Sequence, residues 1–286
     1  IADLCSKDLE SINGLILQKL DSTVPLIHEI ASYLILSGGK RLRPIMTSCC
    51  FHLINRKEEI DKDHIGLAAA VEFIHAATLL HDDVIDESKR RRGNLTANEV
   101  WGNKTSVLVG DFLFSRAFQL MTKYGNLNVL KILSDTSVII SEGEVLELSN
   151  DKDPTINEDI YFSVINGKTA SLFSAACQVG GISAKGTDKE IESLKSFGTN
   201  FGMAFQLIDD AIDYSSNNEA LGKNIGDDFK EGKITLPIIL AYLRSNEVEK
   251  NFWKKTLINL DQKKGDLNNA VKIMQKYNAI SDTVER

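Results

Sequence analysis

The sequence has few of the residues that interrupt helices, and its cysteines lack the spacing of a disulfide or zinc framework. Only four of the 286 residues are proline, and no segment rich in proline, glycine and serine divides the chain, so we expect one domain over residues 1–286. The four cysteines show no Cys-x-x-Cys spacing, which indicates buried thiols in a reducing compartment. We therefore expect a cytoplasmic protein. The chain begins at Ile1 and ends inside an apparent helix, so we expect a few more residues at both ends.

An excess of positive charge, a membrane-spanning segment and a strand pattern are also missing. The formal net charge of -7 argues against general nucleic-acid binding. No apolar run reaches membrane-spanning length without a charge or a histidine, and no signal peptide is visible. No segment alternates polar and β-branched residues between hairpin turns. The fold class that these absences leave is all-α.

Helical periodicity covers most of the chain. Pro25 suits the first turn of a helix, and Asn166-Gly167 predicts a kink. We expect a mobile polar loop over the site at 215–233. The expected helices are 8–36 with a break near Pro25, 44–54, 62–88, 96–101, 106–124, 128–148, 159–179, 188–214, 234–243 and 248 onward.

The first chemically informative stretch is an apolar run, 67–80, that leads into an acidic cluster. The run is rich in alanine and leucine and apolar nearly all round, which indicates a buried helix. Asp82 and Asp86 follow it four residues apart, so their carboxylates lie on one helix face and repel each other. A hard cation such as Mg2+, which takes carboxylate, water and phosphate oxygens, would offset that repulsion. A single acidic cluster on a helix is more often part of a solvent-exposed face than of a metal site.

A second copy of the same pattern strengthens the metal hypothesis. Asp209, Asp210 and Asp213 again follow a mostly apolar run and again read Asp-Asp-x-x-Asp. Two such clusters indicate two carboxylate walls that face each other across a cavity and bind a polyphosphate through Mg2+.

Basic residues next to glycines point to a second anion. Lys40, Arg41 and Arg43 follow or adjoin Gly38-Gly39, residues 90–92 are three arginines before Gly93, and Lys168 lies at the expected kink. Arginine forks suit phosphate oxygens. One anion would then be held by metal and the other by cations.

Three other kinds of site fit these residues less well. Neither Gly38-Gly39-Lys40 nor Gly167-Lys168-Thr169 has the glycine spacing or preceding strand of a P-loop. Glu72-x-x-His75 is half of a di-iron motif and has no second copy. His81-Asp82 resembles an HD phosphohydrolase doublet, but no further histidine ligands lie near the second cluster. For His75, a core histidine and a substrate contact are equally compatible with the residues.

Over essentially its whole length the chain resembles the trans-polyprenyl diphosphate synthases, also called polyprenyl synthetases. The resemblance implies an all-α bundle of the isoprenoid synthase type around a deep central cavity, usually in a homodimer, and is nearest to the long-chain octaprenyl and decaprenyl enzymes of quinone side chains. The matching motifs are Gly39-Lys40-x-x-Arg43-Pro44, Asp82-Asp83-x-x-Asp86, Arg91-Arg92-Gly93, Gly143-Glu144, Gly167-Lys168-Thr169, Phe205-Gln206-x-x-Asp209-Asp210-x-x-Asp213, Gly222-Lys223-x-x-Gly226-Asp227-Asp228 and Glu231-Gly232-Lys233.

The resemblance implies a role for each matching residue. Two or three Mg2+ ions would bridge the allylic diphosphate and Asp82, Asp86 and Asp209, with Asp83, Asp210 and Asp213 as neighbouring or water-mediated supports. Thr169 and Gln206 would flank the reacting carbons. Glu147 stands where the family pattern suggests glutamine. The allylic diphosphate would be contacted by Arg91, Lys168, Lys223 and Lys233, and isopentenyl diphosphate by Lys40, Arg43, His75 and Arg92.

Product length is predicted from the helix that leads into Asp82. Thr78 and Ala77 lie about one turn (~5.4 Å) below the metal, with Ile74 further down. Short-chain members of the family carry an aromatic ring at this level, so small residues here favour a deep tunnel and a long product. A stop provided by Leu133 or Phe173 on another helix is an alternative. A geranylgeranyl diphosphate synthase, a class I terpene cyclase and a non-catalytic subunit are the competing functions.

Overall fold

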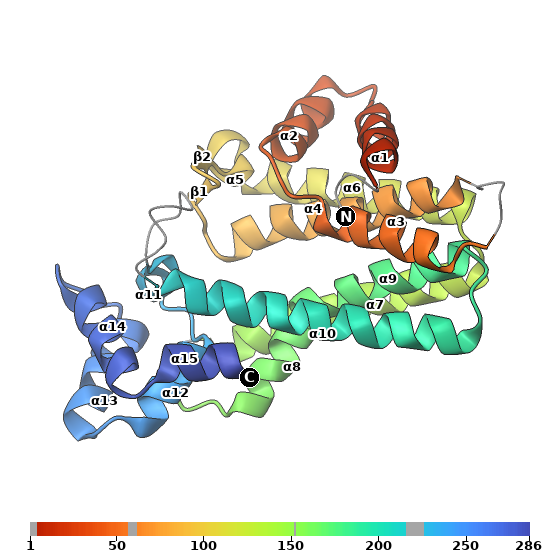
Figure 1. Cartoon of the computed structure of the whole chain (residues 1–286). Coiled ribbons are helices and arrows are strands. Elements are labelled where there is room, and N and C mark those ends of the chain that lie inside the picture. Colours follow the sequence, from red (N-terminus) through yellow and green to blue (C-terminus); the bar gives the residue numbers. More distant parts are fainter. Residues whose placement is uncertain (1–4, 57–61, 152, 216–225) are drawn as a thin grey trace. The chain divides into compact units, whose positions relative to one another are not determined.

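The computed structural model describes residues 5–56, 62–151, 153–215 and 226–286 (Figure 1). Within these ranges the chain is almost wholly helical, which confirms the all-α class. The one strand pairing in the described ranges joins β1 (Arg90–Arg91) to β2 (Asn94–Leu95), antiparallel and two residues long. Lys223 lies outside the described residues.

The chain divides into two compact units, which we describe one at a time. The first comprises residues 1–138 and 172–198, and the second comprises 139–171 and 199–286. The division falls within the long helices α7 (Leu127–Ser149) and α10 (Asp188–Asp213).

The first unit contains six helices from the N-terminal part of the chain together with α9 (Ser171–Ser183) and the first parts of α7 and α10. Pro25 is the first residue of its helix, as the sequence predicts. The six helices are α1 (Ser6–Lys19), α2 (Pro25–Leu36), α3 (Leu42–Ile54), α4 (Asp63–Ile85), α5 (Ala97–Trp101) and α6 (Asn103–Tyr124).

Helix α4 is the buried centre of this unit and packs along α6. The two helices approach closely at glycines, since a Cβ on Gly66 would lie 2.1 Å from the Tyr124 ring and one on Gly110 2.3 Å from His81 Nε2. Among the described residues α4 is the one helix long and apolar enough to span a membrane. However, 78% of its apolar window is buried inside the protein, as in the core helix of a globular protein.

The second half of α4 is accessible mainly along one face, although His81, Val84 and Ile85 near its end are also partly or fully exposed. His75, Thr78, Leu79 and Asp82 are partly exposed and Asp86 is exposed, whereas the residues between 64 and 74 are buried. These positions follow the three- and four-residue spacing of one helix face. The structure therefore places the first acidic cluster at the end of an accessible stripe on an otherwise buried helix.

The second unit is built from short helices around an apolar core. Trp253, Tyr214 and Phe229 are its largest fully buried side chains. Figure 1 shows α12 to α15 gathered at the C-terminal end of the chain. Besides the second parts of α7 and α10, its helices are α8 (Glu158–Ile165), the π-helix η1 (Asn166–Ala170), α11 (Asp227–Glu231), α12 (Leu236–Arg244), α13 (Glu247–Trp253), the π-helix η3 (Lys254–Ile258), α14 (Asp266–Lys276) and α15 (Ala279–Glu285).

The predicted kink at Asn166-Gly167 is a π-helix. Gly167 packs directly on α7: a Cβ there would lie 2.9 Å from Gly143 Cα and 3.1 Å from Ile139 O. A Cβ on Gly143 would in turn lie 2.9 Å from Lys168 N. The two backbones can therefore touch only because both residues are glycine. Single-turn π-bulges commonly occur at functional sites, and this one carries Lys168 and Thr169.

Candidate active site

Each acidic cluster lies in the last turn of a long helix. Asp82 is in the last turn of α4 and Asp86 is its C-cap, while Asp209 and Asp213 end α10. Neither of these last turns contains a basic residue. Carboxylates at the negative end of a helix dipole repel both each other and the dipole. Both helix ends are consequently suited to a hard divalent cation, and this chemistry fits Mg2+.

Asp83 has a different place from its neighbours in the first cluster. Its side chain is 1% exposed and accepts hydrogen bonds from Arg91, Nη2 to Oδ1 at 2.8 Å and Nε to Oδ1 at 3.0 Å. The pair anchors the β1–β2 turn to α4. This geometry favours a positioning role for Asp83, rather than the metal support predicted for it, and it fixes Arg91 next to the cluster.

A cationic group in the first unit surrounds His75. Burial lowers the pKa of His75 well below its usual value, and Arg43, Arg91 and Arg92 lower it further, so the imidazole is neutral. The Arg43 guanidinium lies 4.2 Å above the Phe173 ring, and its buried Nε has no hydrogen-bond partner among the described residues. Burial also lowers the pKa of Arg43 to about 10. A buried donor on a partly buried cation is ready to bind an anion.

The two glycine-flanked basic loops meet at this group. A Cβ on Gly39 would lie 3.2 Å from Arg92 Nη1, so the absence of a side chain lets Arg92 approach the backbone. Lys40 is exposed in the same loop. Arg41 instead donates to Glu72 Oε1 at 2.8 Å and to Ile35 O at 2.8 Å. Arg41 is therefore a structural cation, a distinction that the sequence pattern does not make.

Lys168 in the second unit is held by two carboxylates. Its Nζ lies 2.8 Å from Glu144 Oε2 and also contacts Glu147 Oε2. Burial lowers the pKa of Lys168, but Glu147 and Glu144 raise it more strongly, so the lysine stays charged. Glu147, which departs from the expected glutamine, thus neutralises part of the charge that a diphosphate would meet.

A chain of hydrogen bonds orients Gln206. Thr169 Oγ1 donates to Gln206 Oε1 at 2.9 Å, and Gln206 Nε2 donates to Asp210 Oδ1 at 2.7 Å. Tyr161 donates its hydroxyl to Asp210 Oδ2 at 2.6 Å. Burial raises the pKa of Asp210 to about 6, although the two hydrogen bonds lower it. The sequence does not predict Tyr161 as a site residue, because a single tyrosine 49 positions before Asp210 carries no recognisable motif.

The remaining residues of the second cluster connect to α11. Asp213 accepts the backbone N–H groups of Asp227 at 3.3 Å and Asp228 at 3.2 Å. Lys233, just after α11, lies 3.0 Å from Glu231. Sequence patterning predicts a loop over 215–233, whereas residues 227–231 form this short helix.

The residues predicted to set product length occupy different faces of α4. Ile74 and Ala77 are fully buried, whereas Thr78 is partly exposed on the face that carries Asp82. Ala77 shares the face of His81, which packs against Gly110 of α6. Among the alternative stops, Leu133 is fully buried and Phe173 lies under Arg43.

The comparisons with known proteins agree with these features. A family model described as polyprenyl synthetase matches residues 24–274. The octaprenyl diphosphate synthase of Escherichia coli is 48% identical over 241 residues, 84% of this chain and 74% of that protein.

Two crystal structures are similar over 99% of this chain and 86% of theirs. A decaprenyl diphosphate synthase from Rhodobacter capsulatus is 47% identical with a TM-score of 0.92. A polyprenyl synthase from Caulobacter crescentus, complexed with calcium and isoprenyl diphosphate, is 44% identical with a TM-score of 0.93. On its motifs, its fold and these matches, the chain belongs to the polyprenyl synthetase family.

Proposed function

We propose that this protein is a long-chain trans-polyprenyl diphosphate synthase, which adds isopentenyl diphosphate repeatedly to an allylic diphosphate such as farnesyl diphosphate. The observation that carries the proposal is the presence of an acidic helix end in each unit, together with a cationic group in the first unit whose buried Arg43 Nε has no protein partner among the described residues. A reaction between two diphosphates requires two anion sites, one formed by metal ions on carboxylates and one formed by cationic side chains.

The acidic clusters are proposed to hold two or three Mg2+ ions on the allylic diphosphate, through Asp82, Asp86 and Asp209 with Asp213 in support. When bound, the ions neutralise the charge that develops on the departing diphosphate. Calcium accompanies isoprenyl diphosphate in the Caulobacter relative, which supports a divalent cation at this step.

The side chains position the two substrates around that ionisation. Arg91, Lys168, Lys223 and Lys233 are proposed to contact the allylic diphosphate, and Thr169 and Gln206 to flank the carbons that react. Lys40, Arg43, His75 and Arg92 would hold isopentenyl diphosphate, with a neutral His75 as a hydrogen-bond partner rather than a fourth cation.

The proposed reaction needs no side chain to act as a base. The allylic C–O bond breaks and diphosphate leaves with the electron pair. The isopentenyl double bond attacks the allylic carbon, and the departed diphosphate accepts the proton that the new chain loses. Apolar walls keep water from trapping the cation.

The long product is supported by the octaprenyl and decaprenyl relatives and by the absence of an aromatic ring at Ala77 and Thr78. We also propose that the product serves as the side chain of a quinone, and that the protein is a cytoplasmic homodimer.

Incubation of the purified protein with labelled isopentenyl diphosphate, farnesyl diphosphate and Mg2+ tests the function. Products longer than twenty carbons are expected. A product that stops at geranylgeranyl diphosphate would support the shorter-chain alternative. A cyclic hydrocarbon would support a terpene cyclase, and the absence of any product would support a non-catalytic subunit.

A further inference from the structure

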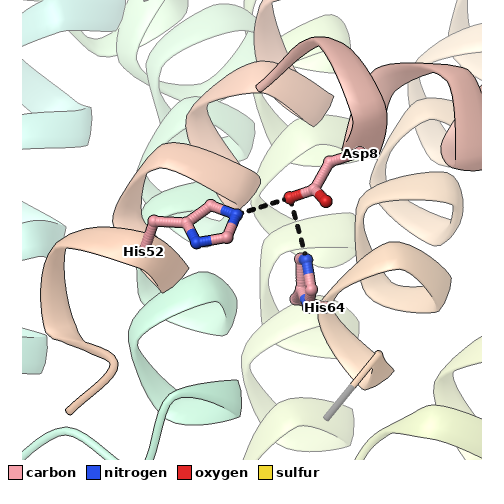
Figure 2. A group of neighbouring side chains, drawn as sticks. All are labelled: Asp8, His52 and His64. Atoms are coloured by element: carbon pink, nitrogen blue, oxygen red, sulfur yellow. Dashed lines mark hydrogen bonds and ion pairs between the residues drawn. The ribbon is translucent and has the colours of Figure 1, made fainter. Parts of the chain in front are cut away.

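Asp8, His52 and His64 form a compact cluster in the first unit that has no part in the proposed reaction (Figure 2). They come from three helices, α1, α3 and α4. His52 Nε2 lies 2.7 Å and His64 Nε2 3.0 Å from the same oxygen, Asp8 Oδ2. Figure 2 shows both rings with one nitrogen directed at that carboxylate.

The cluster is far from the acidic cluster on the same helix. His64 is in the first turn of α4 and Asp82 in the last. Eighteen residues at about 1.5 Å each separate the two by about 27 Å. A ligand of the cluster is therefore distinct from the proposed diphosphate-bound ions.

The donor atoms are spaced for one small cation. Zinc binds imidazole nitrogen and carboxylate oxygen at about 2.0–2.2 Å in a tetrahedron, which sets its ligands about 3.3 Å apart. The two nitrogen–oxygen distances of 2.7 and 3.0 Å would have to lengthen by about 0.6 and 0.3 Å to reach that separation. All three ligand atoms already lie within 4.8 Å of one another.

The surroundings hold two ligands in place and leave one side open. His64 is 1% exposed and stacks on the Phe51 ring at 3.8 Å. Ser48 Oγ donates to Asp8 Oδ2 at 2.5 Å, which fixes the carboxylate. The side chains of His52 and Asp8 are 25% and 20% exposed, so water can reach a fourth position.

We propose that Asp8, His52 and His64 bind one borderline divalent cation, Zn2+ in the first instance, with water as the fourth ligand. Two imidazoles and one carboxylate select Zn2+, Co2+ or Ni2+ over Mg2+, which prefers oxygen ligands. The ion ties α1 to α3 and α4. The competing explanation is a metal-free hydrogen-bonded cluster, in which Asp8 accepts from both rings.

Cobalt provides the direct test, because four-coordinate Co2+ absorbs visible light and Mg2+ does not. Untagged, metal-stripped protein is titrated with Co2+ in excess Mg2+, which is added to compete with Co2+ for the acidic clusters. We expect one equivalent of Co2+ with four-coordinate absorption, displaced by one equivalent of Zn2+. His52→Ala should abolish the absorption, and the matched control His28→Ala, an exposed histidine on α2 outside the cluster, should retain it.

Thermal unfolding gives a second readout that does not depend on prenyl transfer. Zn2+ should raise the Tm of the wild type and of His28→Ala, but not of His52→Ala or Asp8→Asn. His52 is chosen because it is the more exposed histidine, so its loss is best tolerated. Absence of stoichiometric cobalt binding in the wild type, or an unchanged cobalt spectrum in His52→Ala, overturns the proposal. Variants that lower Tm equally with and without Zn2+ show a hydrogen-bonded cluster and overturn it as well.

Discussion

At the scale of single residues, the surroundings of Arg43 are compatible with an anionic ligand. Its guanidinium stacks on Phe173 and its buried Nε has no partner among the described residues. Arg43→Lys keeps the charge but removes the planar fork. One lost charge-assisted hydrogen bond is worth about 1.5–3 kcal/mol, so the KM for isopentenyl diphosphate should rise roughly ten- to a hundredfold.

Steady-state kinetics with each substrate varied in turn measure this effect. The KM for the allylic substrate should change less than twofold. Arg90→Lys, an exposed arginine in the β1–β2 turn, is the control and should leave both constants unchanged. An equal rise for both substrates would instead indicate a general electrostatic effect of Arg43.

The two glutamates that hold Lys168 should differ in importance because they differ in exposure. The Glu144 side chain is 18% exposed and the Glu147 side chain 43%. Glu144→Gln should cost about 1–3 kcal/mol of unfolding free energy. Glu147→Gln should cost below about 1 kcal/mol, as for other solvent-screened pairs. Urea denaturation measures both, and a larger cost for Glu147→Gln contradicts the assigned geometry.

At the scale of elements, the contact between α7 and η1 depends on two glycines. A Cβ at position 143 would meet backbone atoms of Gly167 and Lys168 at 2.9–3.1 Å, and backbone cannot move aside cheaply. Gly143→Ala should therefore destabilise the fold by about 1–3 kcal/mol and lower turnover, because it displaces Lys168.

Gly14 on α1 provides the matched control, because a Cβ there meets nothing within 4 Å. Gly14→Ala should leave turnover unchanged and stabilise the protein by about 0.5–1 kcal/mol. Thermal unfolding and turnover of both variants decide the matter. If Gly143→Ala behaves like Gly14→Ala, the close contact does not exist in solution.

Most helices up to α12 could be predicted from sequence to within a few residues, because their start and stop signals are local, whereas the division of 247–285 into α13, η3, α14 and α15 was not predicted. Pro25 begins α2 and the kink at Gly167 is the π-helix η1. The β1–β2 pairing and α11 were not predicted. Both are too short to carry a periodic pattern, and α11 depends on Asp213, which receives two of its first N–H groups across fourteen residues or more.

The sequence predicts which residues belong to the candidate site, but it does not predict which of them bind each other. The spacing of Asp82 and Asp86 places both on one helix face, and the structure agrees. No spacing rule pairs Asp83 with Arg91, or Lys168 with Glu147, because those partners meet through tertiary structure. For the same reason the sequence did not distinguish Arg41, which is bound to Glu72, from Arg43.

At the scale of the whole molecule, the face of α4 that carries Asp82 should determine product length. By sequence position alone, a tyrosine at either Ala77 or Thr78 would lie about one turn below Asp82. Thr78, however, shares the accessible face with Asp82, whereas Ala77 is fully buried. We expect Thr78→Tyr to shift the product to fifteen or twenty carbons without abolishing the first condensation.

Ala77→Tyr should act differently, because a ring at a fully buried alanine overpacks the core and lowers Tm. Chromatography of the dephosphorylated products, together with thermal unfolding, separates the two effects. An unchanged product length in Thr78→Tyr would mean that the growing chain does not pass this face of α4.

The proposed function requires both acidic clusters to serve one Mg2+-dependent condensation. The measurement is the rate of isopentenyl diphosphate incorporation into farnesyl diphosphate, as a function of Mg2+ concentration, for the wild type, Asp82→Ala and Asp209→Ala. Each substitution removes a carboxylate from a helix end suited to a cation, so turnover should fall by orders of magnitude while the helical circular dichroism is preserved. Near-normal turnover with unchanged Mg2+ dependence in either variant would contradict the account.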